Sequence, residues 1–188
     1  AREGKWQTGV GWTLAGRTIG LVGLGRLGAR TAAIANFFNM RVVAWSENLT
    51  AERALECGAE LVSRADLFSQ SDIVSIHLLL SRRTQGLITA DDLALMKSDA
   101  YLVNTSRGPI IDEKALIDFL RAGRIGGAAL DVFDQEPLSK DHPFLGLDNT
   151  VISPHMAYVT EENLAEFYLE TVEDITAWLN GDPIRVLS

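Results

Sequence analysis

Short runs of apolar and β-branched residues alternate along the chain with segments in which apolar residues recur at helical spacing. The runs predict strands at 18–22, 41–45, 73–76, 100–103, 127–132 and 151–152. The other segments predict helices at 26–36, 51–56, 113–122 and 161–180, of which the last three begin after Thr50, Asp112 and Thr160. Further helix starts are predicted at Ser63 and Thr89. Such alternation is typical of α/β proteins, so we expect a doubly wound parallel sheet with crossover helices.

Two of the predicted helices carry apolar stripes, which normally pack against a core. In the first helix the predicted buried stripe consists of Leu27, Ala33, Ile34 and Phe37. In the last helix a longer stripe recurs on related turns and is also expected to face a core; it consists of Leu164, Phe167, Tyr168, Val172, Ile175 and Leu179.

Residues 23–28 read GLGRLG and lie between the first predicted strand and the first predicted helix. In that context Gly23 permits a tight turn, Gly25 lets a pyrophosphate approach the backbone, and Gly28 lets the helix lie against the sheet. The helix N-terminus then offers free N–H groups and the positive end of its dipole to the phosphates. The alternative is that these glycines only shape the corner. We expect a Rossmann-type, dinucleotide-binding fold.

The residues after the second strand bear on the choice of dinucleotide. An acid at its end normally accepts hydrogen bonds from the adenosine ribose hydroxyls. Here Ser46 stands at the expected position and Glu47 follows it; the nearest downstream cation is Arg53. Glu47 could turn in and favour NAD, or it could be a solvated loop acid, with Ser46 leaving room for the 2′-phosphate of NADP. Because no cation adjoins Ser46 in the sequence, we favour NAD.

Three polar residues stand at or just past predicted strand ends: Arg107, Glu136 and His155. Each also has a purely structural interpretation. Arg107 could satisfy loop carbonyls, Glu136 could be an exposed turn acid, and His155 could be a satisfied strand-end histidine. Ligands of open parallel sheets bind beyond the carboxyl ends of the strands. We therefore expect all three to face one crevice, on the same edge as the glycine turn.

Composition narrows the function classes. The 188 residues carry a net charge of −8, and the pI is about 4.9, so nucleic acid and anionic membranes are poor partners. The single cysteine, Cys57, suits a reducing compartment and a cytoplasmic location. The sequence has no apolar run long enough to span a membrane and no metal-ligand spacing, and we expect neither a secretion signal nor a metal.

Four stretches together make the chain resemble the D-isomer-specific 2-hydroxyacid dehydrogenases, from about Trp12 to Val186: residues 20–28, 103–109, 130–137 and 153–155. The resemblance implies that Arg107 binds the substrate carboxylate through its planar fork of donors. It implies that His155 is the general acid and base, and that Glu136 orients the imidazole and stabilises its charged form. The implied reaction is hydride transfer between a nicotinamide cofactor and a small D-2-hydroxy acid or 2-keto acid.

The same resemblance implies further positions along the cofactor. Arg26 and Leu27 would offer backbone N–H groups to the pyrophosphate, Leu78 would lie on the adenine side, Thr105 near the nicotinamide ribose and Asp131 beside the carboxamide. Arg107 and His155 would border the nicotinamide as well. His77 and His142 are interpreted as structural and loop residues. A homodimer is also implied, with the loop around Trp6 and Trp12 as a candidate contact.

The sequence also departs from the family pattern. Ser46 replaces the ribose acid, and Ala157-Tyr158 replaces a small, often glycine-bearing stretch after the histidine. We expect residues 1–158 to form the dinucleotide-binding domain, and residues 159–188 to be a helix and tail that return to a substrate domain whose upstream segment is missing. The chain would then bind dinucleotide but turn over poorly. The alternatives are a corepressor-like module that senses dinucleotides, and a different dehydrogenase that shares only the glycine turn.

Overall fold

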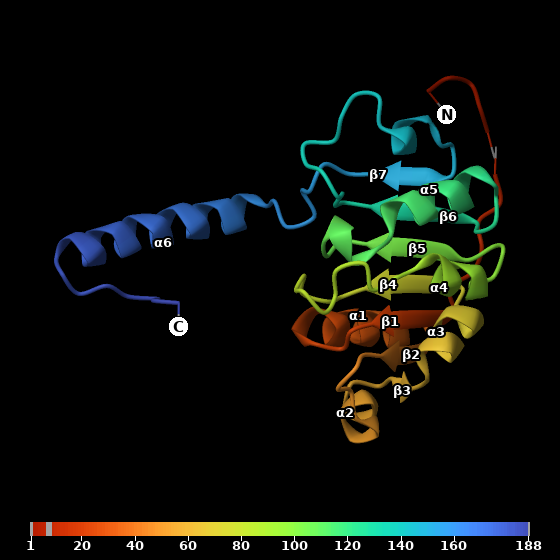
Figure 1. Ribbon diagram of the computed structural model, residues 1–188, viewed down its shortest axis with the longest axis horizontal. Coiled ribbons are helices and arrows are strands. Elements are labelled where there is room, and N and C mark those ends of the chain that lie inside the picture. Colours follow the sequence, from red (N-terminus) through yellow and green to blue (C-terminus); the bar gives the residue numbers. More distant parts are fainter. Residues whose placement is uncertain (1, 7–8, 188) are drawn as a thin grey trace. The chain divides into compact units, whose positions relative to one another are not determined.

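The computed structural model describes residues 2–6 and 9–187. Within them, seven strands form one sheet in which every neighbouring pair is parallel, in the order β3-β2-β1-β4-β5-β6-β7 (Figure 1). The strands are β1 (Thr18–Val22), β2 (Arg41–Trp45), β3 (Glu60–Leu61), β4 (Ile73–Ile76), β5 (Tyr101–Asn104), β6 (Gly127–Leu130) and β7 (Thr150–Ile152). The chain builds outward from β1 in one direction and then from β4 in the other, so the strand order reverses between them. This confirms the doubly wound sheet.

The helices follow the predicted alternation, and most begin at a side-chain cap. Thr50, Ser63, Asp112 and Thr160 each accept a hydrogen bond from a backbone N–H in the first turn of the helix that follows. The helices are α1 (Arg26–Phe37), α2 (Ala51–Glu56), α3 (Arg64–Gln70), α4 (Ala90–Leu95), α5 (Glu113–Arg121) and α6 (Glu161–Leu179), with short 3₁₀ turns η1 (Gly108–Ile110) and η2 (Pro143–Gly146).

Alternation of side chains along the strands creates two separate cores. Along β2, Val42 and Ala44 belong to one apolar cluster and Val43 to the other, as the two-residue period of a strand requires. The first cluster includes Ala32 and Ala35 of α1. The second takes buried residues from α3, α4 and α5. The central strands are therefore covered on both faces, which explains why they read as near-continuous apolar runs.

The predicted stripe on α1 is wrong. Leu27, Ile34 and Phe37 are 63%, 59% and 81% exposed, and Ala33 is exposed too. The buried positions are Gly28, Ala32 and Ala35. The helix lies so close to β1 that only small residues fit between them, so the large side chains point outward.

The chain divides into two compact units, one up to Pro154 and the other from His155 onward. The second unit contains α6, in which none of the described residues is buried. The expectation that its apolar stripe faces a core is therefore wrong for the described part of the chain. A role for residues 159–188 in a substrate domain stays a prediction.

Asp72 ties three strands together at the amino edge of the sheet. Its carboxylate accepts from the Thr18 backbone N–H at 2.7 Å and from Lys97 Nζ at 2.9 Å, and Arg17 lies 3.5 Å away. Its carbonyl accepts from the Tyr101 N–H at 2.9 Å. Burial alone would raise the pKa of Asp72, but the Thr18 hydrogen bond and the two cations outweigh it and hold the pKa below 3.8.

Replacing Asp72 with Asn should destabilise the chain by about 1–3 kcal/mol at pH 7, because the carboxylate loses its charge-assisted partners. Since the folded state lowers this pKa, the stabilisation is complete above the ordinary value of 3.8 and disappears as pH falls through the lowered one. Urea unfolding at pH 7 and pH 3 should therefore show a smaller difference between D72N and the parent at pH 3. Asp148→Asn is the control, because Asp148 is exposed. Equal effects of the two variants on stability would contradict the stabilising role of the Asp72 carboxylate.

Candidate functional site

The turn after β1 is held by hydrogen bonds to its neighbouring strands. The Gly23 N–H donates to the carbonyl of Trp45 at 2.9 Å, and the His77 N–H donates to the carbonyl of Val22 at 2.8 Å. Gly23 has a φ of 100°, and a Cβ there would lie 2.5 Å from the His77 carbonyl oxygen and 2.8 Å from Leu78 Cδ2. Glycine is required for both reasons. The turn therefore sits in contact with the ends of both strands that flank β1.

Gly25 and Gly28 have different surroundings. A Cβ on Gly28 would overlap the carbonyl oxygen of Gly23, so this glycine permits the close approach of α1 to the turn. A Cβ on Gly25 would meet no atom within 4 Å, so the backbone there borders open space. Gly25 is the N-cap of α1 and provides no side-chain cap, and the first turn of the helix contains no acidic residue. The first N–H groups of α1 are thus available to an anion.

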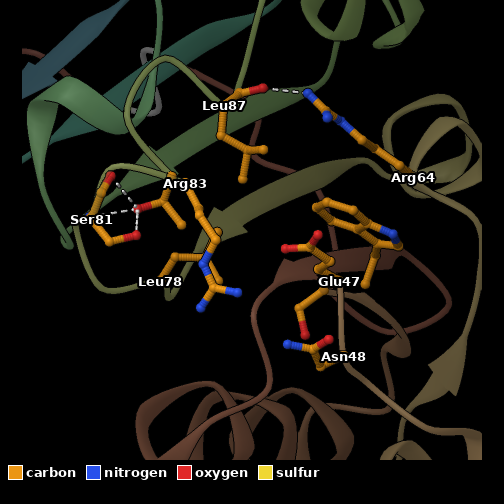
Figure 2. A pocket seen from close by; sticks show the side chains of 10 residues that line it. Glu47, Asn48, Arg64, Leu78, Ser81, Arg83 and Leu87 are labelled. Atoms are coloured by element: carbon orange, nitrogen blue, oxygen red, sulfur yellow. Dashed lines mark hydrogen bonds between the residues drawn. The ribbon is translucent and has the colours of Figure 1, made fainter.

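A pocket of about 530 Å³ opens at the end of β2 (Figure 2). It brings together three residues that the sequence analysis singled out, Ser46, Glu47 and Leu78. The other lining residues are Trp45, Asn48, Arg64, Ser81, Arg83, Thr84 and Leu87. Arg64 and Arg83 were missed, because they follow Ser46 at a distance in the chain and only the fold places them at the same pocket. Ser46 has no cation beside it in the sequence, but two arginines line the same pocket in the structure.

Arg64 forms a fixed wall of this pocket. Its Nε and Nη2 atoms donate to the two carboxylate oxygens of Asp92 at 2.8 and 2.5 Å, and it also donates to the Leu87 carbonyl (Figure 2). Its guanidinium lies 5.4 Å from the ring centre of Trp45. Asp92 is buried and also accepts from the Thr89 backbone N–H, which completes a capping box at the start of α4. The charge of Arg64 is therefore balanced within the protein.

The turn after β5 carries the predicted residues Thr105 and Arg107. Asn104 is buried and fixes this turn, since its Nδ2 donates to the Arg107 carbonyl at 2.9 Å and its Oδ1 accepts from the Ser106 N–H at 3.0 Å. Ser106 Oγ donates to the Ile76 carbonyl at 2.8 Å. The backbone is therefore held while the Arg107 side chain stays exposed, with Nη1 2.6 Å from the Ser106 carbonyl oxygen. Asn104 was not singled out by the sequence analysis, although its position at the end of an apolar run was a usable signal.

The loop after β6 carries Asp131 and Glu136, and hydrogen bonds also fix its course. The Asp131 N–H donates to the Asn104 carbonyl at 3.0 Å, and Glu136 Oε1 accepts from the Phe133 N–H at 2.9 Å. This loop touches the preceding turn at Gly108, where a Cβ would overlap the Phe133 carbonyl group. The structure therefore brings the segments of Arg107, Asp131 and Glu136 together at one end of β5 and β6.

Glu113 at the start of α5 supports the same loop. Its Oε2 accepts from the Asp134 N–H at 3.1 Å, and its Oε1 lies 3.1 Å from His142 Nε2. His142 caps η2, as its Nδ1 accepts from the Phe144 N–H. Burial, followed by the neighbouring carboxylates of Glu113 and Asp112, raises the pKa of Asp134. The structure thus gives His142 a defined partner in Glu113.

Two other histidines lie at strand ends or beyond them. His77 follows β4, its Nε2 is 3.0 Å from Ser75 Oγ, and burial lowers its pKa. His155 is the first residue of the second unit and is described with that unit. Its φ of 52° is unusual for a residue with a side chain, and its ring meets the Tyr158 ring edge-on at a centroid distance of 6.0 Å. Asn39 and Arg185 also have a positive φ, of 57° and 52°.

Two further features are absent from the described ranges 2–6 and 9–187. They contain no group of three or more His, Cys, Asp or Glu residues placed to hold a metal ion. No helix in the same ranges has the length and apolar character that crossing a membrane requires.

A glycine turn at an uncapped helix start, beside a pocket at the end of β2, is the geometry of a Rossmann dinucleotide-binding domain. The family described as D-isomer specific 2-hydroxyacid dehydrogenase, NAD binding domain, matches residues 1–157. The chain belongs to this family.

Similar proteins include the glyoxylate reductase of Aeropyrum pernix, which is 42% identical over 184 residues, or 94% of this chain and 55% of that protein. A crystal structure of a glyoxylate reductase from Paecilomyes thermophila has a TM-score of 0.82 and 32% identity, covering 97% of this chain and 56% of that one. The structure of an acyclic imino acid reductase in complex with NADPH and D-Arg has a TM-score of 0.79 and 35% identity. The match covers 95% of this chain and 56% of that one. The chain spans about half the length of the curated relatives it matches.

The two glycines should differ sharply when replaced. Gly28→Ala forces a Cβ onto the Gly23 carbonyl and should destabilise the chain by about 1–3 kcal/mol through overpacking. Gly25→Ala meets open space at a φ of −72° and should change stability by less than about 0.5 kcal/mol. Urea unfolding of both variants measures this, and equal destabilisation would contradict the described packing.

Proposed function

We propose that the chain is the cofactor-binding part of a nicotinamide-dependent dehydrogenase that interconverts small D-2-hydroxy acids and 2-keto acids. The observation that carries this proposal is the open backbone at Gly25, at the uncapped start of α1, beside the pocket of Ser46 and Glu47. A Cβ would fill the space that a pyrophosphate needs, and the adjoining pocket has room for an adenosine. The residues present therefore fit a dinucleotide.

The roles proposed for the cofactor side are those that the glycine turn and the family resemblance imply. The backbone N–H groups of Arg26, Leu27 and Gly28 bind the pyrophosphate, and Gly23 shapes the turn that presents them. Leu78 packs against the adenine side. Glu47 accepts from the ribose hydroxyls, which favours NAD. Thr105 and Asp131 lie on turns at the carboxyl edge of the sheet and serve the nicotinamide end.

The cofactor supplies or accepts the hydride when bound. Arg107 binds the substrate carboxylate with two parallel donors, and Asn104 holds the turn from which it projects. His155 gives a proton to the carbonyl oxygen in reduction and removes it in the reverse direction, because a positioned histidine can serve as general acid and as general base. Glu136 orients that imidazole and stabilises its charged form.

Three further proposals concern the whole protein. We propose that residues 159–188 belong to a substrate domain, with the exposed apolar face of α6 as its packing surface. We propose a homodimer, to which the exposed Trp6 of the N-terminal segment contributes; Trp12 instead packs 5.2 Å from the ring of Tyr101. A cytoplasmic location agrees with the single, unpaired Cys57. A dinucleotide-sensing module without turnover is the competing function.

Titration of this chain with NADH should show energy transfer from its four tryptophans to the bound nicotinamide. Gly25→Ala should weaken the dinucleotide at least about tenfold, since the added methyl group occupies the approach of the pyrophosphate. Gly146→Ala is the matched control, because its Cβ also meets open space but lies in η2. Equal affinity of both variants, or no binding by the parent chain, would refute the assigned dinucleotide site.

His155→Gln tests the enzyme against the sensing module in the longest natural protein that contains this chain. We expect kcat to fall by about 10²–10⁴-fold, because the positioned acid and base is removed. NADH affinity, measured by the same energy transfer, should change by less than about threefold. Unchanged turnover, or no turnover by the parent protein on any 2-keto acid, would favour the sensing module.

A further inference from the structure

Arg83 is a second cation at the pocket where Glu47 would hold the adenosine ribose. It lies on the loop between β4 and α4 and lines the pocket together with Ser46 and Glu47. In Figure 2 its side chain runs from the loop past Leu78 into the pocket, across from Glu47 and Asn48. The fold thus adds an arginine to the lining of the pocket that Ser46 and Glu47 share, although none stands beside Ser46 in the sequence.

Arg83 and Arg64 differ in how their charges are balanced. Arg64 donates through Nε and Nη2 to the two carboxylate oxygens of Asp92, and Nη2 also donates to the Leu87 carbonyl. Arg83, in contrast, forms no hydrogen bond or ion pair with any residue in the described part of the chain. Its planar fork of donors is available to a ligand in the pocket, and a phosphate is the ligand that such a fork matches.

The loop that carries Arg83 is braced by its own hydrogen bonds. Thr84 Oγ1 accepts from the Ser81 backbone N–H at 2.8 Å and donates to the Leu79 carbonyl at 2.7 Å. The Gln85 N–H donates to the Ser81 carbonyl at 2.9 Å. These bonds fix the backbone on both sides of Arg83 while its side chain stays exposed at the pocket. The arginine is therefore presented from a defined position.

The neighbouring surface directs an anion to this side of Ser46. A second hollow also has Trp45, Ser46 and Glu47 in its lining, but its other charged residues are Glu60 and Asp66. A phosphate on the ribose would be repelled from that hollow and attracted toward Arg83. Ser46 is small and adds a hydroxyl donor, whereas an acid at its position would repel the phosphate.

We propose that Arg83 and Ser46 bind the 2′-phosphate of NADP(H), so that the site takes both dinucleotides. Glu47 serves the free ribose hydroxyls of NAD(H), and Arg83 with Ser46 serves the phosphate. This inference rests on the proposed function, because it requires the adenosine end of a dinucleotide in this pocket. It extends the expectation of NAD drawn from the sequence, which counted only cations close to Ser46 in the chain.

The test compares NADH and NADPH on this chain by energy transfer from tryptophan, with 2′,5′-ADP and 5′-AMP as competitors. We expect the parent chain to bind both reduced dinucleotides with affinities within about tenfold. Arg83→Gln should weaken NADPH and 2′,5′-ADP by about tenfold to a hundredfold, the usual loss for a charge-assisted pair, and change NADH by less than threefold. Glu47→Gln should weaken NADH and strengthen NADPH.

Arg82→Gln is the matched control, since Arg82 is the adjacent exposed arginine and does not line the pocket. Binding of NADH without NADPH would overturn this inference and leave the proposed function standing. Equal effects of the Arg82 and Arg83 variants, or equal loss of both dinucleotides in R83Q, would also overturn it. A parent chain that binds neither dinucleotide refutes both proposals.

Discussion

The contact between the backbone of Gly28 and the carbonyl of Gly23 is the constraint on which the rest of the structure depends. It brings α1 close to β1, and this closeness leaves room for only Ala32 and Ala35 beneath the helix. It also fixes where the helix begins, at the open backbone of Gly25. The same contact therefore determines the packing of one core and the position of the free N–H groups at the sheet edge.

The carboxyl edge of the sheet is ordered beyond the strands themselves. The residue directly after a strand donates a backbone hydrogen bond to the last carbonyl of the neighbouring strand. This holds at four places: Gly23 to Trp45, His77 to Val22, Asp131 to Asn104 and Ser153 to Leu130. Each turn is thus in register with the next one. Such continuity lets segments far apart in the sequence present their side chains from fixed starting points.

Much of this could be predicted from the sequence. Turn glycines and helix caps act locally, so the GLGRLG turn and the caps Thr50, Ser63, Asp112 and Thr160 were recognisable in the one-dimensional pattern. The parallel sheet followed from the alternation of elements. The short strand β3 was missed, because two exposed residues give no hydrophobic period.

The wrong and missed predictions share a physical cause: the local sequence does not determine which distant segments lie close together in the fold. The large residues on α1 looked like a core face, but the helix approaches the sheet too closely for them. Arg64 and Arg83 reach the Ser46 pocket from α3 and from the loop after β4, so their role depends on strand order. The relation of His155 to Arg107 and Glu136 stays a prediction, since His155 belongs to the other unit.

The loop from Leu79 to Thr84 has a consequence for how such a protein can diverge. Its shape is maintained by its own Ser and Thr hydrogen bonds, and its exposed side chains take no part in either core. Exchanges at its tip therefore cost little folding free energy. Substitutions in this loop can therefore change the lining of the Ser46 pocket, while the sheet and its glycine turn keep their packing.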